Sequence, residues 1–164
     1  MPVHSNARGR DLAVNFVRVS DKLDTAGQPD REQLGRLAER GYGMVINLAP
    51  PHAHGAVETE GKLVAQAGIT YVNIPVEWEQ PRYSDFELFS GVLDQAGERK
   101  VLVHCMLNMR GSVFVFLYRV IHQMIPPAEA YRFVRKVWIP NEQWRAFGRM
   151  VLQKHNFDFE FPDK

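Results

Sequence analysis

The sequence predicts a three-layer α/β/α fold with a central, mostly parallel sheet of four to five strands. Apolar runs of strand length alternate with helical segments over residues 15–110, which is typical of right-handed strand–helix–strand crossovers. One run, Met44 to Ala49, is apolar almost without interruption, as expected of a strand that is covered on both faces. After Arg110 the pattern predicts helices only, so a helical layer should close one face of the sheet.

The first half of the chain is expected to alternate strands with helices. A turn-rich segment, Asp24 to Pro29, leads to a helix that begins near Asp30. Asp30 and Gln33 have the spacing of a capping box, and Gly41 should end this helix. In chain order, the expected elements are a strand at 15–19, this helix, a strand at 44–49 and a weaker helix at 57–67.

The second half begins with a strand and ends with three helices. Ser84 and Glu87 have the spacing of a second capping box, and apolar side chains recur behind them at helical intervals. The expected elements are a strand at 70–76, a helix behind Ser84, a strand at 100–105, and helices at 112–123, 128–137 and 142–154. The helix at 112–123 is apolar almost all round and should therefore be buried.

Composition limits the possible functions. The length of 164 residues fits one domain spanning residues 1–164, and 45% hydrophobic residues suffice for one core. Lys and Arg total 20 against 19 acidic residues, spread along the chain, which argues against a nucleic-acid or membrane partner. The longest apolar run, Val113 to Tyr118, is too short to cross a bilayer. A single cysteine excludes an internal disulfide and indicates a reducing, cytoplasmic setting, while the oligomeric state stays open.

The cysteine occupies the place where α/β sheets bind ligands. Cys105 ends the strand at 100–105, and ligand crevices lie outside the carboxyl ends of such strands. A helix that starts near Gly111 would direct its unpaired amides and positive end toward the loop, favouring a thiolate and an oxyanion. Arg110 could grip two oxygens of that anion, and Ser112 could hydrogen-bond the thiolate. The alternative is an inert, buried cysteine, which is the more common role of a lone thiol.

The segment "VHCMLNMRGS", residues 103–112, resembles the active-site loop of the cysteine-dependent (dual-specificity and tyrosine) phosphatases. Their pattern is His-Cys, five residues, Arg, then Ser or Thr. Here four residues separate Cys105 from Arg110, and Gly111 stands before Ser112. The shorter spacing is similar to that of the rhodanese sulfurtransferases and of the phosphatase-like domain related to bacterial beta-lactamase-hydrolase-like proteins.

Two further segments resemble the phosphatase side. "TAGQPDREQLGRLAERGYGMVINLAP" is similar to the opening of the beta-lactamase-hydrolase-like family, where a Ser-Gly-Gln-Pro turn precedes a helix and a Val-Ile-Asn strand. "IPNEQWRAF" is similar to a late Pro-Asn-x-x-aromatic element of the dual-specificity phosphatases. The resemblance covers about residues 20–150, and its closest family is the beta-lactamase-hydrolase-like one.

This resemblance implies a phosphoric monoester hydrolase that needs no cofactor and no metal. Cys105 would attack the phosphorus atom of a small-molecule or protein phosphomonoester, and a cysteinyl-phosphate would form. His104 is expected to support the loop by hydrogen bonds. Asn108 stands where the family has glycine, and asparagine is the next best residue for a left-handed backbone. The residues expected to bind the phosphoryl group are Met106, Leu107, Asn108, Met109, Arg110 and Gly111.

The general acid of the expected site has several candidates. In the phosphatases that this chain resembles, it is an aspartate on the loop after the third strand, but "PVEWEQPR" contains none. Trp78 stands near that place, which leaves Glu79 and Glu77 as the candidates and Asp85 as a third choice. Each of these residues would otherwise be an ordinary solvated carboxylate.

Two other functions fit parts of the pattern. A rhodanese-like sulfurtransferase would use a Cys105 persulfide and would need no general acid. A phosphate-binding module with weak or no catalysis would use Arg110 and the loop amides alone. His52 and His54 could contact a substrate or metal, but the absence of a third ligand at suitable spacing favours a solvated loop.

Overall fold

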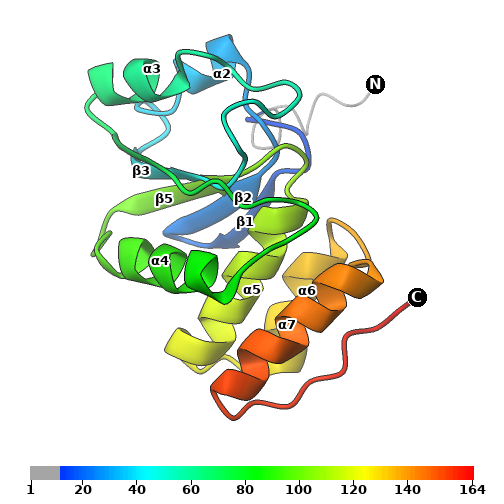
Figure 1. Ribbon diagram of the computed structural model, residues 1–164. Coiled ribbons are helices and arrows are strands. Elements are labelled where there is room, and N and C mark those ends of the chain that lie inside the picture. Colours follow the sequence, from blue (N-terminus) through cyan, green and yellow to red (C-terminus); the bar gives the residue numbers. More distant parts are fainter. Residues whose placement is uncertain (1–11) are drawn as a thin grey trace, which may run out of the picture.

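The computed structural model describes residues 12–164, and in it a five-stranded sheet lies between two layers of helices (Figure 1). The predicted three-layer fold is therefore confirmed. The strands are β1 (Val17–Ser20), β2 (Leu23–Ala26), β3 (Tyr42–Asn47), β4 (Thr70–Asn73) and β5 (Lys100–His104). The helices are α2 (Arg31–Leu34), α3 (Glu60–Gln66), α4 (Tyr83–Asp94), α5 (Met109–Gln123), α6 (Pro127–Arg135) and α7 (Glu142–Lys154).

The strand order is β1-β2-β5-β3-β4, and only the β1–β2 pair is antiparallel. Strand β5 lies in the middle, with β2 on one side and β3 on the other. His104, its last residue, is in register with Ala26 of β2 and with Asn47 of β3. The carboxyl ends of three parallel strands thus meet at one edge of the sheet, where a ligand site is expected.

The two helical layers enclose separate parts of the core. Helices α2 and α3 cover one face, and α4 to α7 lie on the other (Figure 1). The residues of α5 from 110 to 120 are all buried, as its apolar sequence predicted. After α7 the chain returns across this layer, and Phe161 packs against Phe116 and Tyr131. No helix within residues 12–164 is long and apolar enough to span a membrane.

Strand β2 occupies a segment that the sequence predicted to be a turn. All four of its residues are buried, including Asp24 and Thr25, although aspartate is rare inside a sheet. The Asp24 carboxylate accepts hydrogen bonds from the Tyr42 hydroxyl (2.5 Å) and from Arg18 Nε (3.2 Å). These partners satisfy the buried charge, so tertiary contacts override the local preference for a turn.

Several helix boundaries differ from the prediction. The Asp30–Gln33 capping box is confirmed, but α2 ends at Leu34 and turns fill residues 35–40. The cap predicted at Ser84 is wrong, because α4 already begins at Tyr83. The residue at the cap is Arg82, whose backbone amide donates a hydrogen bond to the Asp85 carboxylate. Helix α5 begins at Met109 instead of residue 112, which places Arg110 in its first turn.

Buried tyrosines predict a loss of stability at alkaline pH. Burial disfavours the phenolate, so the pKa values of Tyr42, Tyr71 and Tyr118 are raised, that of Tyr71 to about 12. The unfolded chain releases these protons near pH 10 and the folded chain retains them. Folding stability is therefore fully present below about pH 10 and falls toward pH 12, by about 1–2 kcal/mol per buried tyrosine.

Urea unfolding between about pH 8 and pH 12 measures this slope. Tyr71→Phe removes one of the titrating groups and should make the decline smaller. An unfolding free energy that stays level above pH 10, or a Tyr71→Phe decline as steep as that of the wild type, would contradict the assignment.

Candidate active site

Cys105 is the first residue after β5, and the ends of the neighbouring strands hold it on both sides. Its amide donates to the carbonyl of Ala26 (3.3 Å), while the carbonyl of His104 accepts from the amide of Leu48 (2.8 Å). The cysteine is only 1% exposed. Such burial is also typical of an inert cysteine, so its role must be judged from the groups around it.

Three consecutive carbonyls of the loop after β5 are hydrogen-bonded to groups outside the loop. In a trans peptide the N–H points away from the C=O, and every peptide here is trans. The amides that follow these carbonyls are therefore turned in the opposite direction. The contacts are His104 Nδ1 to the Cys105 carbonyl (3.2 Å), the Gln28 amide to the Met106 carbonyl (2.9 Å) and Asn15 Nδ2 to the Leu107 carbonyl (3.0 Å).

The amides of this loop have no hydrogen-bond partners among residues 12–164. Within the described part of the chain, the backbone N–H groups of residues 106–111 donate no hydrogen bond, and the first amide beyond them, that of Ser112, donates to the Asn108 carbonyl (3.0 Å). The last of the free amides belong to the first turn of α5, where the helix dipole is positive. Successive free amides at a helix start form a concave donor surface that suits an oxyanion.

Asn108 shapes the end of the loop. Its backbone is left-handed (φ 67°), as its place in the motif predicted. Its side-chain amide is fully buried and donates to the carbonyl of Asn15 (2.8 Å) and to the hydroxyl of Thr25 (2.9 Å). These two bonds, from segments far away in the sequence, compensate the cost of a left-handed conformation in a residue other than glycine.

Arg110 presents an unused edge of its guanidinium. The side chain is 6% exposed, and Nη1 donates to the carbonyl of Val76 (3.0 Å). Nε is buried and has no hydrogen-bond partner among the residues that the structure describes. Because Nη1 is already engaged, the edge formed by Nε and Nη2 is the one that can hold two oxygens of a tetrahedral anion. An unpaired buried donor is costly, and a bound oxyanion would remove that cost.

Ser112 is engaged away from the thiol in this structure. Its hydroxyl donates to the carbonyl of Met109 (3.0 Å) and accepts from Trp138 Nε1 (3.2 Å). To hydrogen-bond a Cys105 thiolate, the hydroxyl would have to leave the Met109 carbonyl. The role expected for Ser112 thus stays a prediction.

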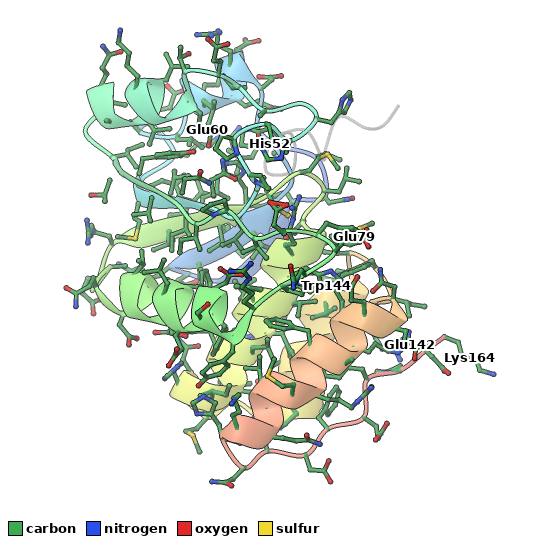
Figure 2. The ribbon with its side chains drawn as sticks, in the orientation of Figure 1. His52, Glu60, Glu79, Glu142, Trp144 and Lys164 are labelled. Atoms are coloured by element: carbon green, nitrogen blue, oxygen red, sulfur yellow. The ribbon has the colours of Figure 1, made fainter. Side chains whose placement is uncertain are left out.

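The loop between β4 and α4 carries the candidate acids. It passes over the amino end of α5 (Figure 1), and both Glu77 and Glu79 are exposed. The Trp78 ring lies 5.5 Å from each of the rings of Trp138 and Trp144. Trp144 Nε1 donates to the Trp78 carbonyl (3.0 Å), which ties this loop to α7 beside Glu79 (Figure 2). No contact joins either glutamate side chain to Cys105 or Arg110, so their role stays a prediction.

One functional candidate was missed by the sequence analysis. Glu60 looks like an ordinary surface residue at a helix start, but it is 3% exposed and hydrogen-bonds to His104 Nε2 (2.5 Å). No local pattern signals a contact between residues so far apart. His52 and His54 are exposed, and within residues 12–164 no three His, Cys, Asp or Glu side chains are grouped as metal ligands.

Gly27 is required for the shape of the loop. A Cβ atom at this position would lie 2.4 Å from Val14 Cγ1 and 2.6 Å from the Met106 carbonyl oxygen. Gly27→Ala must therefore push the loop outward. We expect it to destabilise the fold by about 1–3 kcal/mol and to weaken binding of an oxyanion probe roughly tenfold or more.

Gly91→Ala is the matched control, because nothing lies within 4 Å of a Cβ atom at that position inside α4. Alanine there should stabilise the helix by up to about 1 kcal/mol and leave oxyanion binding unchanged. Urea unfolding and titration with inorganic phosphate measure both variants. Equal behaviour of the two variants would show that the close approach of Gly27 to Met106 does not matter.

The solved structures similar to this chain include a candidate phosphatase of the DUF442 family from Shewanella putrefaciens CN-32. That crystal structure is 32% identical in sequence and superimposes with a TM-score of 0.82. The match covers 93% of this chain and 99% of the other. At this identity and coverage, the likeness extends to the family and not only to the fold.

Two curated relatives from Xylella fastidiosa (strains Temecula1 / ATCC 700964 and 9a5c) are each described as a beta-lactamase hydrolase-like protein. Each is 30% identical over 112 residues, which is 66% of this chain but 26% of the relative. The chain therefore spans about a quarter of these longer proteins. No family model matches the sequence.

A more distant likeness concerns the fold alone. The core catalytic domain of the PP-IP phosphatase SIW14 from S. cerevisiae, solved in complex with citrate, is 14% identical with a TM-score of 0.69. The match covers 88% of this chain and 87% of that domain. The three-layer architecture is thus shared with phosphatases that have little sequence in common with this chain.

Proposed function

This chain belongs to the DUF442 family of phosphatase-like proteins, and from that premise we propose that it hydrolyses phosphomonoesters through a cysteinyl-phosphate intermediate. One observation carries the proposal: in the described part of the chain, the amides of residues 106–111 and Nε of Arg110 have no hydrogen-bond partners, and they belong to the loop and helix start that follow Cys105. This arrangement supplies donors for a tetrahedral anion next to a nucleophile. The substrate is a small-molecule or protein phosphomonoester, and the reaction needs no cofactor.

In the first step, Cys105 Sγ attacks phosphorus and the bond to the leaving oxygen breaks. The loop amides and the Nε–Nη2 edge of Arg110 hold the three other phosphoryl oxygens, where charge is concentrated in the transition state. The departing oxygen takes a proton from Glu79 or from Glu77. The positive end of α5 and Arg110 favour the thiolate that this attack requires.

In the second step, water attacks the cysteinyl-phosphate. The sulfur–phosphorus bond breaks, inorganic phosphate leaves, and the thiolate is restored. The glutamate that gave up its proton in the first step accepts one from this water. Ser112 assists by turning its hydroxyl from the Met109 carbonyl to the sulfur as sulfur becomes the leaving group.

The decisive experiment offers the purified protein p-nitrophenyl phosphate and, separately, thiosulfate with cyanide. Release of nitrophenol and inorganic phosphate is the expected result. Thiocyanate formation without phosphate release would replace the proposal by a sulfurtransferase that uses a Cys105 persulfide. Binding of inorganic phosphate with neither reaction would replace it by an oxyanion-binding module.

A further inference from the structure

We propose that Glu60 is a positioning residue for Cys105 and acts through His104. The inference rests on the proposed function, because it assigns a role in preparing the nucleophile. Glu60 is the first residue of α3, and its side chain lies between that helix and the sheet (Figure 2). A carboxylate that is 3% exposed needs a compensating partner, and here the partner is the residue before the nucleophile.

The contacts form a chain from α3 to the loop. Glu60 Oε2 lies 2.5 Å from His104 Nε2, and His104 is fully buried. The other ring nitrogen, Nδ1, lies 3.2 Å from the carbonyl oxygen of Cys105. The second carboxylate oxygen of Glu60 accepts from Gln28 Nε2 (2.8 Å), so both oxygens are occupied.

These contacts fix the number of protons. The Cys105 carbonyl can only accept, so Nδ1 of His104 must carry a proton. One more proton lies between Nε2 and the carboxylate. In the proposal this proton belongs to His104, so that an imidazolium is paired with the Glu60 carboxylate.

The same contacts hold the loop mechanically. His104 fixes the carbonyl of Cys105, and the backbone amide of Gln28 fixes the next carbonyl, that of Met106 (2.9 Å). The side chain of Gln28 also donates to Glu60. The Glu60 carboxylate therefore contacts both His104 and Gln28, the two residues that hold the carbonyls of Cys105 and Met106. The amides of Met106 and Leu107, which are expected to bind the anion, are oriented by these peptides.

The pair also influences the charge on the thiol. The positive ring adjoins Cys105 in the chain, and the carboxylate lies on the far side of that ring, so the nearer charge favours a thiolate. From α5, Arg110 acts in the same direction. From β4, Tyr71 faces Glu60, since Glu60 helps to raise its pKa, but the phenol is neutral at neutral pH. Asp24 of β2 and Lys100 of β5 lie nearer the start of the strands and pair with each other (3.9 Å).

The E60Q variant tests the charge without removing the contacts. The introduced amide can donate to Nε2 of a neutral His104 and can still accept from Gln28, so the loop should keep its shape. We expect the pH midpoint of Cys105 alkylation by iodoacetamide to rise by roughly one unit, which slows alkylation about tenfold below that midpoint. Cys105 is the only cysteine, so the reaction reports on this thiol alone.

Asp94→Asn is the matched control. It weakens another short carboxylate contact, to the Tyr118 hydroxyl (2.5 Å), at the opposite end of the sheet, and should leave the alkylation profile unchanged. E60A removes the contacts as well as the charge, and it should weaken binding of inorganic phosphate in addition to shifting the profile. Circular dichroism checks that each variant is folded.

An alkylation profile of folded E60Q that superimposes on the wild type would overturn the inference, whatever the enzyme does. The readout does not need turnover, so it separates the two proposals. A shifted profile in a protein that hydrolyses no phosphomonoester would support the role of Glu60 on the thiol and reject the proposed function. Turnover of the phosphomonoester with an unshifted alkylation profile would support the proposed function and reject the role of Glu60.

Discussion

Cys105→Ser is expected to abolish phosphomonoester hydrolysis, lowering kcat by a factor of about 10⁴ or more. A serine hydroxyl is not ionised at neutral pH in this loop, and neither the helix dipole nor Arg110 can compensate for that. The two side chains have nearly the same size, so the buried site should accept the substitution at a cost of about 1 kcal/mol. Turnover of p-nitrophenyl phosphate and urea unfolding measure the two effects.

The affinity for inorganic phosphate distinguishes loss of the nucleophile from misfolding, because a misfolded variant would bind phosphate more weakly. If the sulfur is a thiolate, it repels an anion held by the same loop. Cys105→Ser and Cys105→Ala should therefore bind inorganic phosphate at least as tightly as the wild type. Full activity of Cys105→Ser would show that another residue is the nucleophile. A parallel loss of phosphate binding would show that the cysteine is needed for the shape of the loop.

Elements with a strong apolar period were predictable from sequence. The continuous run at residues 44–49 became the buried strand β3, and α7 occupies residues 142–154 as expected. The resemblance to cysteine-dependent phosphatases and to beta-lactamase-hydrolase-like proteins is confirmed. These signals are local, because burial of one face imposes a period on the residues of that segment alone.

Buried polar residues account for most of what was missed. The sequence predicts a turn where strand β2 lies, because Asp24 is unfavourable inside a sheet and Gly27 and Pro29 follow it, whereas the partners of Asp24, Tyr42 and Arg18, lie outside the segment. Glu60 was overlooked for the same reason, since its partner His104 is 44 residues away. A carboxylate that is neutralised by a distant group leaves no trace in the local pattern.

In the candidate site, too, local sequence predicts some features, while contacts between distant residues determine others. One short motif predicts Cys105 and Arg110 as site residues, whereas the contacts that orient the loop peptides come from other parts of the chain. The Gln28 amide and the Asn15 side chain hold two of the loop carbonyls. The "TAGQP" segment, noticed only as a resemblance, thus has a physical role, because Gly27 lets the chain approach the loop closely.

Arg110→Lys is expected to lower kcat/KM for p-nitrophenyl phosphate by roughly 10²–10³-fold and to weaken binding of inorganic phosphate. The guanidinium does two things at once: Nη1 holds the carbonyl of Val76, and the Nε–Nη2 edge remains for the anion. A lysine ammonium is a single centre without a planar fork. It can satisfy the carbonyl or the phosphate, but it cannot grip two oxygens in the geometry of the transition state.

Arg119→Lys provides the matched control on the same helix. Arg119 is also buried, at 9% exposure, and has an unpaired Nη1, but its guanidinium lies over Phe133 (5.1 Å) and not at the loop. This variant should change kcat/KM less than about twofold, even if it costs some stability. If both lysine variants lost activity equally, the loss would reflect the disturbance of a buried guanidinium in general. If neither did, the free edge of Arg110 would not be what holds the phosphoryl group.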